Sequence, residues 1–277
     1  MKNKIFTIFA SALYMLFVAF WAYIASKGLQ GDHSIAEIFS GLYGLMALFG
    51  GIFGLIVGKK FGGFKSYIGA TVMFISLGLL AQEAGQLIYS AYTQLFKIEI
   101  PYPSWGDVGY FGSVILYILA AWNAVKAVRT KVALKSKLNK TLITVLPLLL
   151  LGFSYFVFLS DYQADSSDIL ATILDFAYPL GQALYIAIAL LALLLSRIFL
   201  GGIMKNAIML LILAFVLQYA ADFMFLYQHN QDTWKTAGLN ELLYLTAYFV
   251  TTLSLVSFNS VILQLSANED ADHGSSN

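Results

Sequence analysis

Six acidic residues lie within or beside long apolar runs of this sequence, where charged side chains are rare. They are Glu37, Glu83, Asp107, Asp175, Asp222 and Glu241. A charged carboxylate inside a bilayer is costly unless it faces water or a partner group, so each of these residues is a candidate for a functional site. The chemistry available to them is ligand binding through charge and hydrogen bonds, or acid–base chemistry of the kind that a membrane hydrolase uses. Glu83 and Asp222 are predicted to lie deepest, about two turns inside their helices.

Glutamines and tyrosines share helix faces with these acids, since residues at i, i+3, i+4 and i+7 of a helix align. Asp107 aligns with Tyr110, Asp175 with Tyr178, Gln182 and Tyr185, and Glu241 with Tyr244 and Tyr248, while Gln82 aligns with Gln86 and Gln218 with Asp222. We predict that these stripes face one another inside a bundle and line an outward-facing polar cavity. The predicted ligand-binding residues are Glu37, Gln82, Glu83, Gln86, Asp107, Tyr110, Asp175, Tyr178, Gln182, Gln218, Asp222, Glu241 and Tyr244.

Two structural explanations of the same residues stay open. Polar side chains can hold membrane helices together through hydrogen bonds of ~0.6 kcal/mol each, and acids in the first turn of a helix are favoured by the helix dipole. Asp107 also has a local role, because Ser104 is a plausible N-cap and an acid three residues later completes a capping box.

The elements that position these residues are predicted to be membrane helices. The chain is 60% hydrophobic and 11% charged, against roughly 25% charged residues in soluble domains. Eight apolar runs are long enough to span a bilayer, and a backbone in lipid must satisfy its own hydrogen bonds, so all eight are predicted to be helices. They cover about residues 5–26, 36–58, 66–93, 107–128, 141–160, 169–196, 204–227 and 239–264. The predicted fold class is an all-α integral membrane protein with an eight-helix membrane domain at 1–264 and a disordered acidic tail at 265–277.

The two halves of the chain carry similar polar positions. Glu37, the Gln82–Gln86 stretch and Asp107 in the first half correspond to Asp175, the Gln218–Asp222 stretch and Glu241 in the second, with separations of about 45 and 25 residues against about 43 and 23. We predict two parallel pseudo-repeats, at about residues 1–128 and 141–264, because each contains an even number of spans.

Basic residues predict the orientation in the membrane. All but three of the 16 lysines and arginines fall on the side of the N-terminus, the exceptions being Lys27, Lys97 and Lys235. The positive-inside rule therefore predicts a multi-pass protein of the bacterial inner membrane with both termini in the cytoplasm. The basic segment VKAVRTKVALKSKLNK between the halves is interpreted as a lipid anchor or a docking site for a protein.

Several chemistries are not supported by the residues present. The absence of cysteine excludes disulfides and iron–sulfur clusters, and a net charge of +1 gives no indication of a nucleic-acid partner. No lysine lies deep in a span to carry retinal, and His33, His229 and His273 lie outside the spans, where they cannot ligate haem. No HExxH helix is present. We expect no cofactor and no metal, and we expect the bilayer, a small molecule or lipid at the outer leaflet, and a cytoplasmic signalling protein or a second copy of the chain as partners.

Three passages resemble the multi-span N-terminal membrane region that many bacteria fuse to diguanylate cyclases, cyclic-di-GMP phosphodiesterases or histidine kinases. They are PYPSWGDVGYFGSVILY (101–117), DFAYPLGQALYIAIALLALLL (175–195) and YAADFMFLY (219–227). The resemblance implies a sensory module, with matching positions at Pro103, Ser104, Asp107, Tyr110, Tyr178, Pro179, Gly181 and Asp222. Gln182 stands where that region carries an acid. Only LSANEDADHGSSN follows Gln264, without a catalytic output domain, so a sensor here is expected to signal through another chain.

Three functions follow as hypotheses. The first is a non-enzymatic sensory or ligand-binding module. The alternative is a small-solute or ion transporter, suggested by the repeats and the acids, although a transport path needs polar residues in the inner half, where only scattered Ser, Thr and Asn occur. The third is an intramembrane lipid hydrolase.

Overall fold

The structure is a computed structural model that describes residues 2–31, 33–127, 137–158, 168–196, 203–231 and 233–274. These residues form helices and no strand, which confirms the all-α prediction for this part of the chain. The helices are α1 (Lys2–Ser26), α2 (Ser34–Leu42), α3 (Leu45–Lys60), the short 3₁₀ helix η1 (Gly63–Lys65), α4 (Tyr67–Ser90), the π-helical η2 (Ala91–Phe96), α5 (Trp105–Ala127), α7 (Lys137–Phe158), α8 (Ile169–Ser196), α9 (Lys205–Asn230) and α10 (Leu239–Gly274).

Seven helical segments are long and apolar enough to cross a membrane. They are Asn3–Ser26, Ser34–Lys60, Tyr67–Phe96, Trp105–Ala127, Ile169–Leu191, Lys205–His229 and Leu239–Leu265, and each coincides with a predicted span. The remaining predicted span, 141–160, falls on α7, whose apolar stretch Leu148–Val157 is shorter. Residues 159 and 160 of that span lie outside the described residues. The helical, apolar bundle is compatible with a multi-pass membrane protein.

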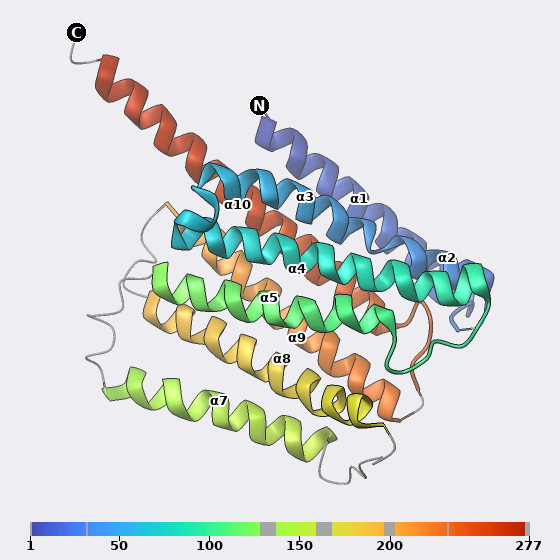
Figure 1. Ribbon diagram of the computed structural model, residues 1–277. Helices are drawn as coiled ribbons and strands as arrows, with labels where there is room; N and C mark the ends of the chain where they lie inside the picture. Colours follow the sequence, from blue (N-terminus) through green and yellow to red (C-terminus); the bar gives the residue numbers. More distant parts are fainter. Residues whose placement is uncertain are drawn as a thin grey trace.

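Six helices form a closed ring in the order α3, α4, α5, α8, α9 and α10, with α10 packing back onto α3 (Figure 1). α1 lies outside the ring against α10, and α7 lies outside it against α8. Fully buried side chains from several ring helices, such as Met46, Leu79 and Leu255, belong to one hydrophobic core. Because α10 closes the ring, side chains from the start and the end of the sequence can meet in its interior.

The start of α1 and the end of α10 lie at the same end of the bundle, which we call the terminal end (Figure 1). Polar side chains connect three helices there. Asn3 Nδ2 donates to Ser260 Oγ (2.7 Å), Lys60 Nζ donates to Asn259 Oδ1 (2.9 Å), and Asn259 Nδ2 donates to Asn3 Oδ1. These contacts fix α1, α3 and α10 relative to one another at this end.

The predicted span 36–58 is not one continuous helix, because α2 ends at Leu42 and α3 begins at Leu45. The amide of Met46 donates to the carbonyl of Tyr43 (3.1 Å), three residues back instead of four. The carbonyl of Ser40 accepts a hydrogen bond from Gln86 Nε2 (2.7 Å) in place of the backbone amide of Gly44. A side chain inserted into the backbone ladder beside a glycine is a known cause of a helix break.

α4 and α5 pack with their backbones close together. A Cβ atom added at Gly109 would lie 2.6 Å from the carbonyl oxygen of Ala81 and 2.6 Å from the amide nitrogen of Gly85. Small residues permit such an approach between membrane helices. The approach brings the polar face of α4, with Gln82 and Gln86, next to the polar face of α5.

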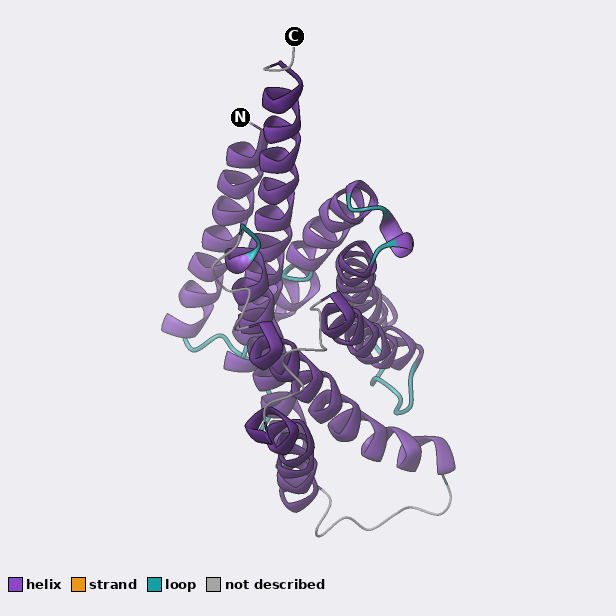
Figure 2. Ribbon diagram, turned by 90° about the vertical axis from the view of Figure 1, so that its left-hand side faces the viewer, coloured by secondary structure: helices purple, strands orange, loops and turns teal. Residues whose placement is uncertain are grey.

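α10 continues as a helix to Gly274, into the segment 265–277 that the sequence analysis expects to be a disordered acidic tail. Residues 264–273 contain neither proline nor glycine and include leucine, alanine, glutamine and glutamate, which have high helix propensity. Figure 2 shows the last part of α10 projecting beyond the bundle at the terminal end.

Candidate functional site

The six predicted acids lie toward the end of the bundle opposite the termini. Glu37, Asp107 and Glu241 are in the first turns of α2, α5 and α10, Asp175 is in the early part of α8, and Glu83 and Asp222 are inside α4 and α9 near the ends of those helices. Figure 1 shows these helix ends at the same end of the bundle.

The carboxylate of Asp222 connects three helices. Its Oδ1 accepts hydrogen bonds from the hydroxyl of Tyr244 in α10 (2.8 Å) and from Gln218 Nε2 in α9 (3.0 Å), and its Oδ2 accepts one from the hydroxyl of Tyr185 in α8 (3.0 Å). Asp222 is 5% exposed. The predicted residues Gln218, Asp222 and Tyr244 therefore meet in one hydrogen-bonded cluster.

Gln86 is the centre of a second cluster, between the α2–α3 break and α5. Its Oε1 accepts hydrogen bonds from the hydroxyls of Tyr110 (2.7 Å) and Tyr43 (3.3 Å), and its Nε2 donates to the carbonyl of Ser40. Both hydroxyl donors thus converge on one acceptor atom.

Gln82, one turn earlier in α4, joins the two halves of the chain. Its Nε2 donates to Ser113 Oγ in α5 (2.7 Å), and its Oε1 accepts a hydrogen bond from the hydroxyl of Tyr248 in α10 (3.1 Å). The ring of Tyr248 stacks on those of Tyr43 and Tyr244, each with a centroid separation of 6.2 Å. This row of tyrosines connects the Gln86 cluster to the Asp222 cluster, and we call the two clusters with Gln82 the polar interior.

Glu241 links α10 to α2. Its Oε2 accepts a hydrogen bond from the backbone amide of Ala237 (2.8 Å), and its Oε1 accepts one from the hydroxyl of Ser40. Glu241 is 4% exposed. Its carboxylate therefore stabilises the start of α10 and also makes a tertiary contact across the ring.

Asp107 has the local role that the sequence predicts. Its Oδ2 accepts a hydrogen bond from the amide of Ser104 (2.7 Å), and Ser104 Oγ accepts one from the amide of Gly106 (3.1 Å). The capping box is therefore confirmed. The other carboxylate oxygen, Oδ1, accepts a hydrogen bond from the hydroxyl of Tyr178 in α8 (2.8 Å), so two predicted site residues are in contact.

Asp175 lies outside the polar interior, near the surface. The hydroxyl of Tyr102, in the loop before α5, donates a hydrogen bond to its Oδ1 (2.6 Å). Partial burial and this hydrogen bond raise the pKa of Tyr102 well above its ordinary value. Tyr102 therefore stays a hydrogen-bond donor and holds the loop against α8.

The side chains of Glu37 and Gln182 take no part in the contacts described above. The backbone carbonyl of Glu37 accepts a hydrogen bond from Gln94 Nε2 (2.6 Å), but its carboxylate takes no part in the contacts above. Gln182 is buried in α8 and contributes no hydrogen bond to either cluster.

Glu83 is buried between its two glutamine neighbours, with 3% exposure. Its Oε2 is a buried atom without a hydrogen-bond partner among the described residues. A Cβ atom added at Gly44 would overlap this oxygen, which places the carboxylate directly against the α2–α3 break.

The sequence prediction missed Ser40, Tyr43 and Ser113. Ser40 lies three residues after Glu37 and Ser113 three residues after Tyr110, so the same helical spacing could have found both. Tyr43 in turn lies three residues after Ser40, with a helical backbone whose amide donates to the carbonyl of Phe39, so the same spacing reaches it from Ser40.

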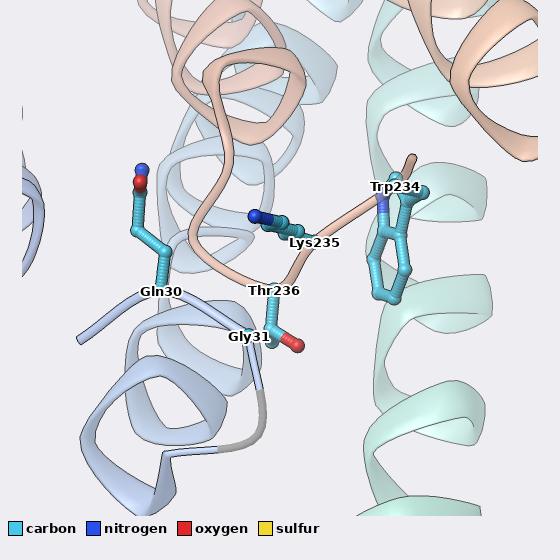
Figure 3. A pocket seen from close by; sticks show the side chains of 5 residues that line it. All are labelled: Gln30, Gly31, Trp234, Lys235 and Thr236. Carbon is cyan, nitrogen blue, oxygen red and sulfur yellow. The ribbon is translucent and has the colours of Figure 1, made fainter. Parts of the chain in front are cut away.

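A pocket of about 400 Å³ lies between the loop after α1 and the loop before α10. Figure 3 shows its five lining residues, Gln30, Gly31, Trp234, Lys235 and Thr236, on two neighbouring loop segments. The amide of Gly31 donates to the carbonyl of Thr236 (3.0 Å) and connects the loops. None of the predicted ligand-binding residues lines this pocket.

The described part of the chain contains no group of three or more histidine, aspartate or glutamate side chains that could together hold a metal ion. The carboxylates of the interior instead contact hydroxyl and amide groups. This arrangement can bind a ligand by hydrogen-bond exchange, because each hydroxyl donor can be replaced by a donor on the ligand.

Comparisons with known proteins give no family for this chain: no protein-family model, no curated protein and no solved structure matches it.

Proposed function

We propose that this chain is a sensory or ligand-binding module of the bacterial inner membrane that passes its signal to a partner protein. The observation that carries the proposal is the Asp222 cluster, in which one buried carboxylate joins α8, α9 and α10. A ligand with a cationic or hydrogen-bond-donating group would compete with Tyr185 and Tyr244 for Asp222. Binding would therefore change how these three helices pack.

α10 gives such a change a route out of the membrane. It has 36 residues, whereas about 20 are enough to span a bilayer. Tyr244 and Tyr248, near its start, take part in the polar interior, while its last part projects beyond the bundle (Figure 2). A shift of the tyrosines would be transmitted along a single rigid helix to a cytoplasmic partner or a second copy of the chain.

The proposal includes eight spans, with α7 as the fifth, and both termini in the cytoplasm. The excess of basic residues on the side of the N-terminus supports this orientation. The common location of the start of α1 and the end of α10 agrees with an even number of crossings (Figure 1).

Two parallel pseudo-repeats also belong to the proposal, and matching hydrogen bonds support them. Tyr110, three residues after Asp107, donates to Gln86 (2.7 Å), and Tyr244, three residues after Glu241, donates to Asp222 (2.8 Å). Gln86 and Asp222 are the last residues of the two stretches that the sequence aligns. The same contact therefore occurs once in each half.

A second pair of contacts supports the same symmetry across the halves. Ser40, three residues after Glu37, donates to Glu241, and Tyr178, three residues after Asp175, donates to Asp107. The helix-starting acid of each half thus accepts a hydrogen bond from the corresponding position of the other half.

The test of the sensory proposal is a ligand screen by thermal shift on the full chain in lipid nanodiscs, with a library of small amines, amino acids and polyols. We expect a compound that raises the melting temperature of the wild type and has no such effect on Asp222→Asn. The control is Asp168→Asn, because Asp168 caps the start of α8 through the amide of Ala171 (2.9 Å), away from the interior. Ligand responses that are equal in wild type and Asp222→Asn would contradict the proposal.

A transporter is the second candidate, and the broken α2–α3 segment favours it, because discontinuous helices form the substrate and ion sites of many transporters. Against it, several hydroxyls nearer the terminal end bond to carbonyls of their own helices: Thr71 to Tyr67, Ser76 to Val72, Thr251 to Ala247 and Thr252 to Tyr248. Such hydroxyls offer little to a passing solute. Uptake of a labelled hit compound into proteoliposomes would favour the transporter, and binding without uptake would favour the sensor.

A further inference from the structure

The carboxylate of Glu83 occupies an unusual place in the bundle. Glu83 is only 3% exposed. Its Oε2 has no hydrogen-bond partner among the described residues and lies against Gly44, just before the start of α3. The buried carboxylates of Asp222 and Glu241, by contrast, accept three and two hydrogen bonds respectively. Glu83 is therefore not accounted for by the hydrogen bonding that holds the interior together.

The α2–α3 break, whose Gly44 lies against this carboxylate, leaves backbone groups without hydrogen bonds. No hydrogen bond between described residues uses the carbonyls of Gly41 and Leu42 or the amides of Gly44 and Leu45. Gly44 is buried, whereas Leu42 and Leu45 are exposed. One carboxylate oxygen and two carbonyls at the break are therefore without hydrogen-bond partners among the described residues.

The charge of Glu83 is not balanced by a neighbouring basic residue. α2 and α4 contain no lysine, arginine or histidine, and the basic residues of α3 and α5, Lys59, Lys60 and Lys126, lie in the last turns of those helices. A buried carboxylate stays ionised only if a positive charge compensates it, and otherwise it takes up a proton.

We propose that Glu83 and the α2–α3 break bind a monovalent alkali cation, sodium or potassium, with the carboxylate and the carbonyls of Gly41 and Leu42 as ligands. One carboxylate matches one positive charge, whereas calcium sites combine several carboxylates. The end of a half-helix supplies carbonyl ligands for Na⁺ in other membrane proteins. The site is separate from the Asp222 cluster and does not depend on which ligand that cluster binds.

The test measures the melting temperature of the full chain in lipid nanodiscs at one alkaline pH and constant ionic strength, with choline chloride replaced stepwise by sodium or potassium chloride. We expect a saturable rise of at least about 2 °C for the wild type with one of these cations. Glu83→Gln should lose the rise, while Glu99→Gln, at an exposed loop position, should keep it.

A second variant keeps the experiment decisive if Glu83→Gln does not fold. Gly44→Ala retains the carboxylate but places a methyl group where its Oε2 lies, so we expect at least a tenfold weaker affinity for radioactive sodium or rubidium in equilibrium binding. Equal melting temperatures of the wild type in choline, sodium and potassium would overturn the proposal. So would an unchanged cation response in Glu83→Gln, or an unchanged affinity in Gly44→Ala.

Discussion

The hydroxyl of Tyr244 donates a hydrogen bond to Oδ1 of Asp222 over 2.8 Å and so connects the first turns of α10 to the last turns of α9. Two further donors, Tyr185 and Gln218, share the same carboxylate. Asp222 is therefore the buried position at which side-chain chemistry and helix packing depend most directly on each other.

Replacement of Asp222 separates shape from charge. Asp222→Leu leaves three donors without an acceptor, and each unsatisfied group costs about 1–3 kcal/mol, so we expect a clearly lower melting temperature. Asp222→Asn keeps an acceptor and a similar shape, and we expect a melting temperature close to that of the wild type. Thermal unfolding of both variants in the same detergent gives the comparison. An equal loss of stability in both variants would show that the charge itself holds α8, α9 and α10 together.

The two tyrosines that share Gln86 should contribute unequally. Tyr110 donates over 2.7 Å and Tyr43 over 3.3 Å, and longer hydrogen bonds are weaker. We expect Tyr110→Phe to lower the free energy of unfolding by ~1 kcal/mol and Tyr43→Phe by less. Steric trapping or denaturant unfolding of the two variants measures the difference, and a larger effect of Tyr43→Phe would contradict the geometry described for Gln86.

The close approach of α4 and α5 predicts opposite outcomes for two glycines of the same helix. Gly109→Ala places a methyl group 2.6 Å from backbone atoms of α4, so the helices must separate, and we expect a loss of about 1–3 kcal/mol. Gly112→Ala meets no atom within 4 Å and should be neutral or stabilising by up to about 1 kcal/mol, because alanine favours helix over glycine. Melting temperatures of the two variants test the contrast, and equal effects would show that α4 and α5 do not depend on this contact.

The orientation can be tested directly because the chain has no cysteine. Two positions at opposite ends of the bundle suit single cysteine substitutions. Lys65 lies in the turn between α3 and α4, and Glu99 lies in the loop before α5. In spheroplasts we expect a membrane-impermeant maleimide to label Glu99→Cys at once and Lys65→Cys only after permeabilisation. The reverse pattern would place both termini outside.

Much of the helix content follows from the sequence, because residues that face lipid or core must be apolar over a length fixed by the bilayer. The break at Gly44 does not, since it depends on Gln86 reaching the carbonyl of Ser40 from another helix.

The site was predictable where residues share one helix. Gln218 and Asp222 align by helical spacing, and they are hydrogen-bonded at 3.0 Å. Contacts between helices, such as Ser40 with Glu241 or Tyr102 with Asp175, require the order of helices around the ring. Helical spacing within one segment contains no information about that order.

The closed ring has a consequence for the biosynthesis of this protein. α3 and α4 leave the ribosome early, but their ring partner α10 and the hydroxyl that satisfies Gln82, that of Tyr248, are made last. Until then, Gln82 Oε1 lacks its donor from α10, and lipid offers it none, whereas the partners of Gln86 in α2, α5 and the α2–α3 break are already made. A nascent chain that stalls before Leu239 would therefore leave Gln82 and Asp222 without the tyrosine hydroxyls that α10 supplies to them.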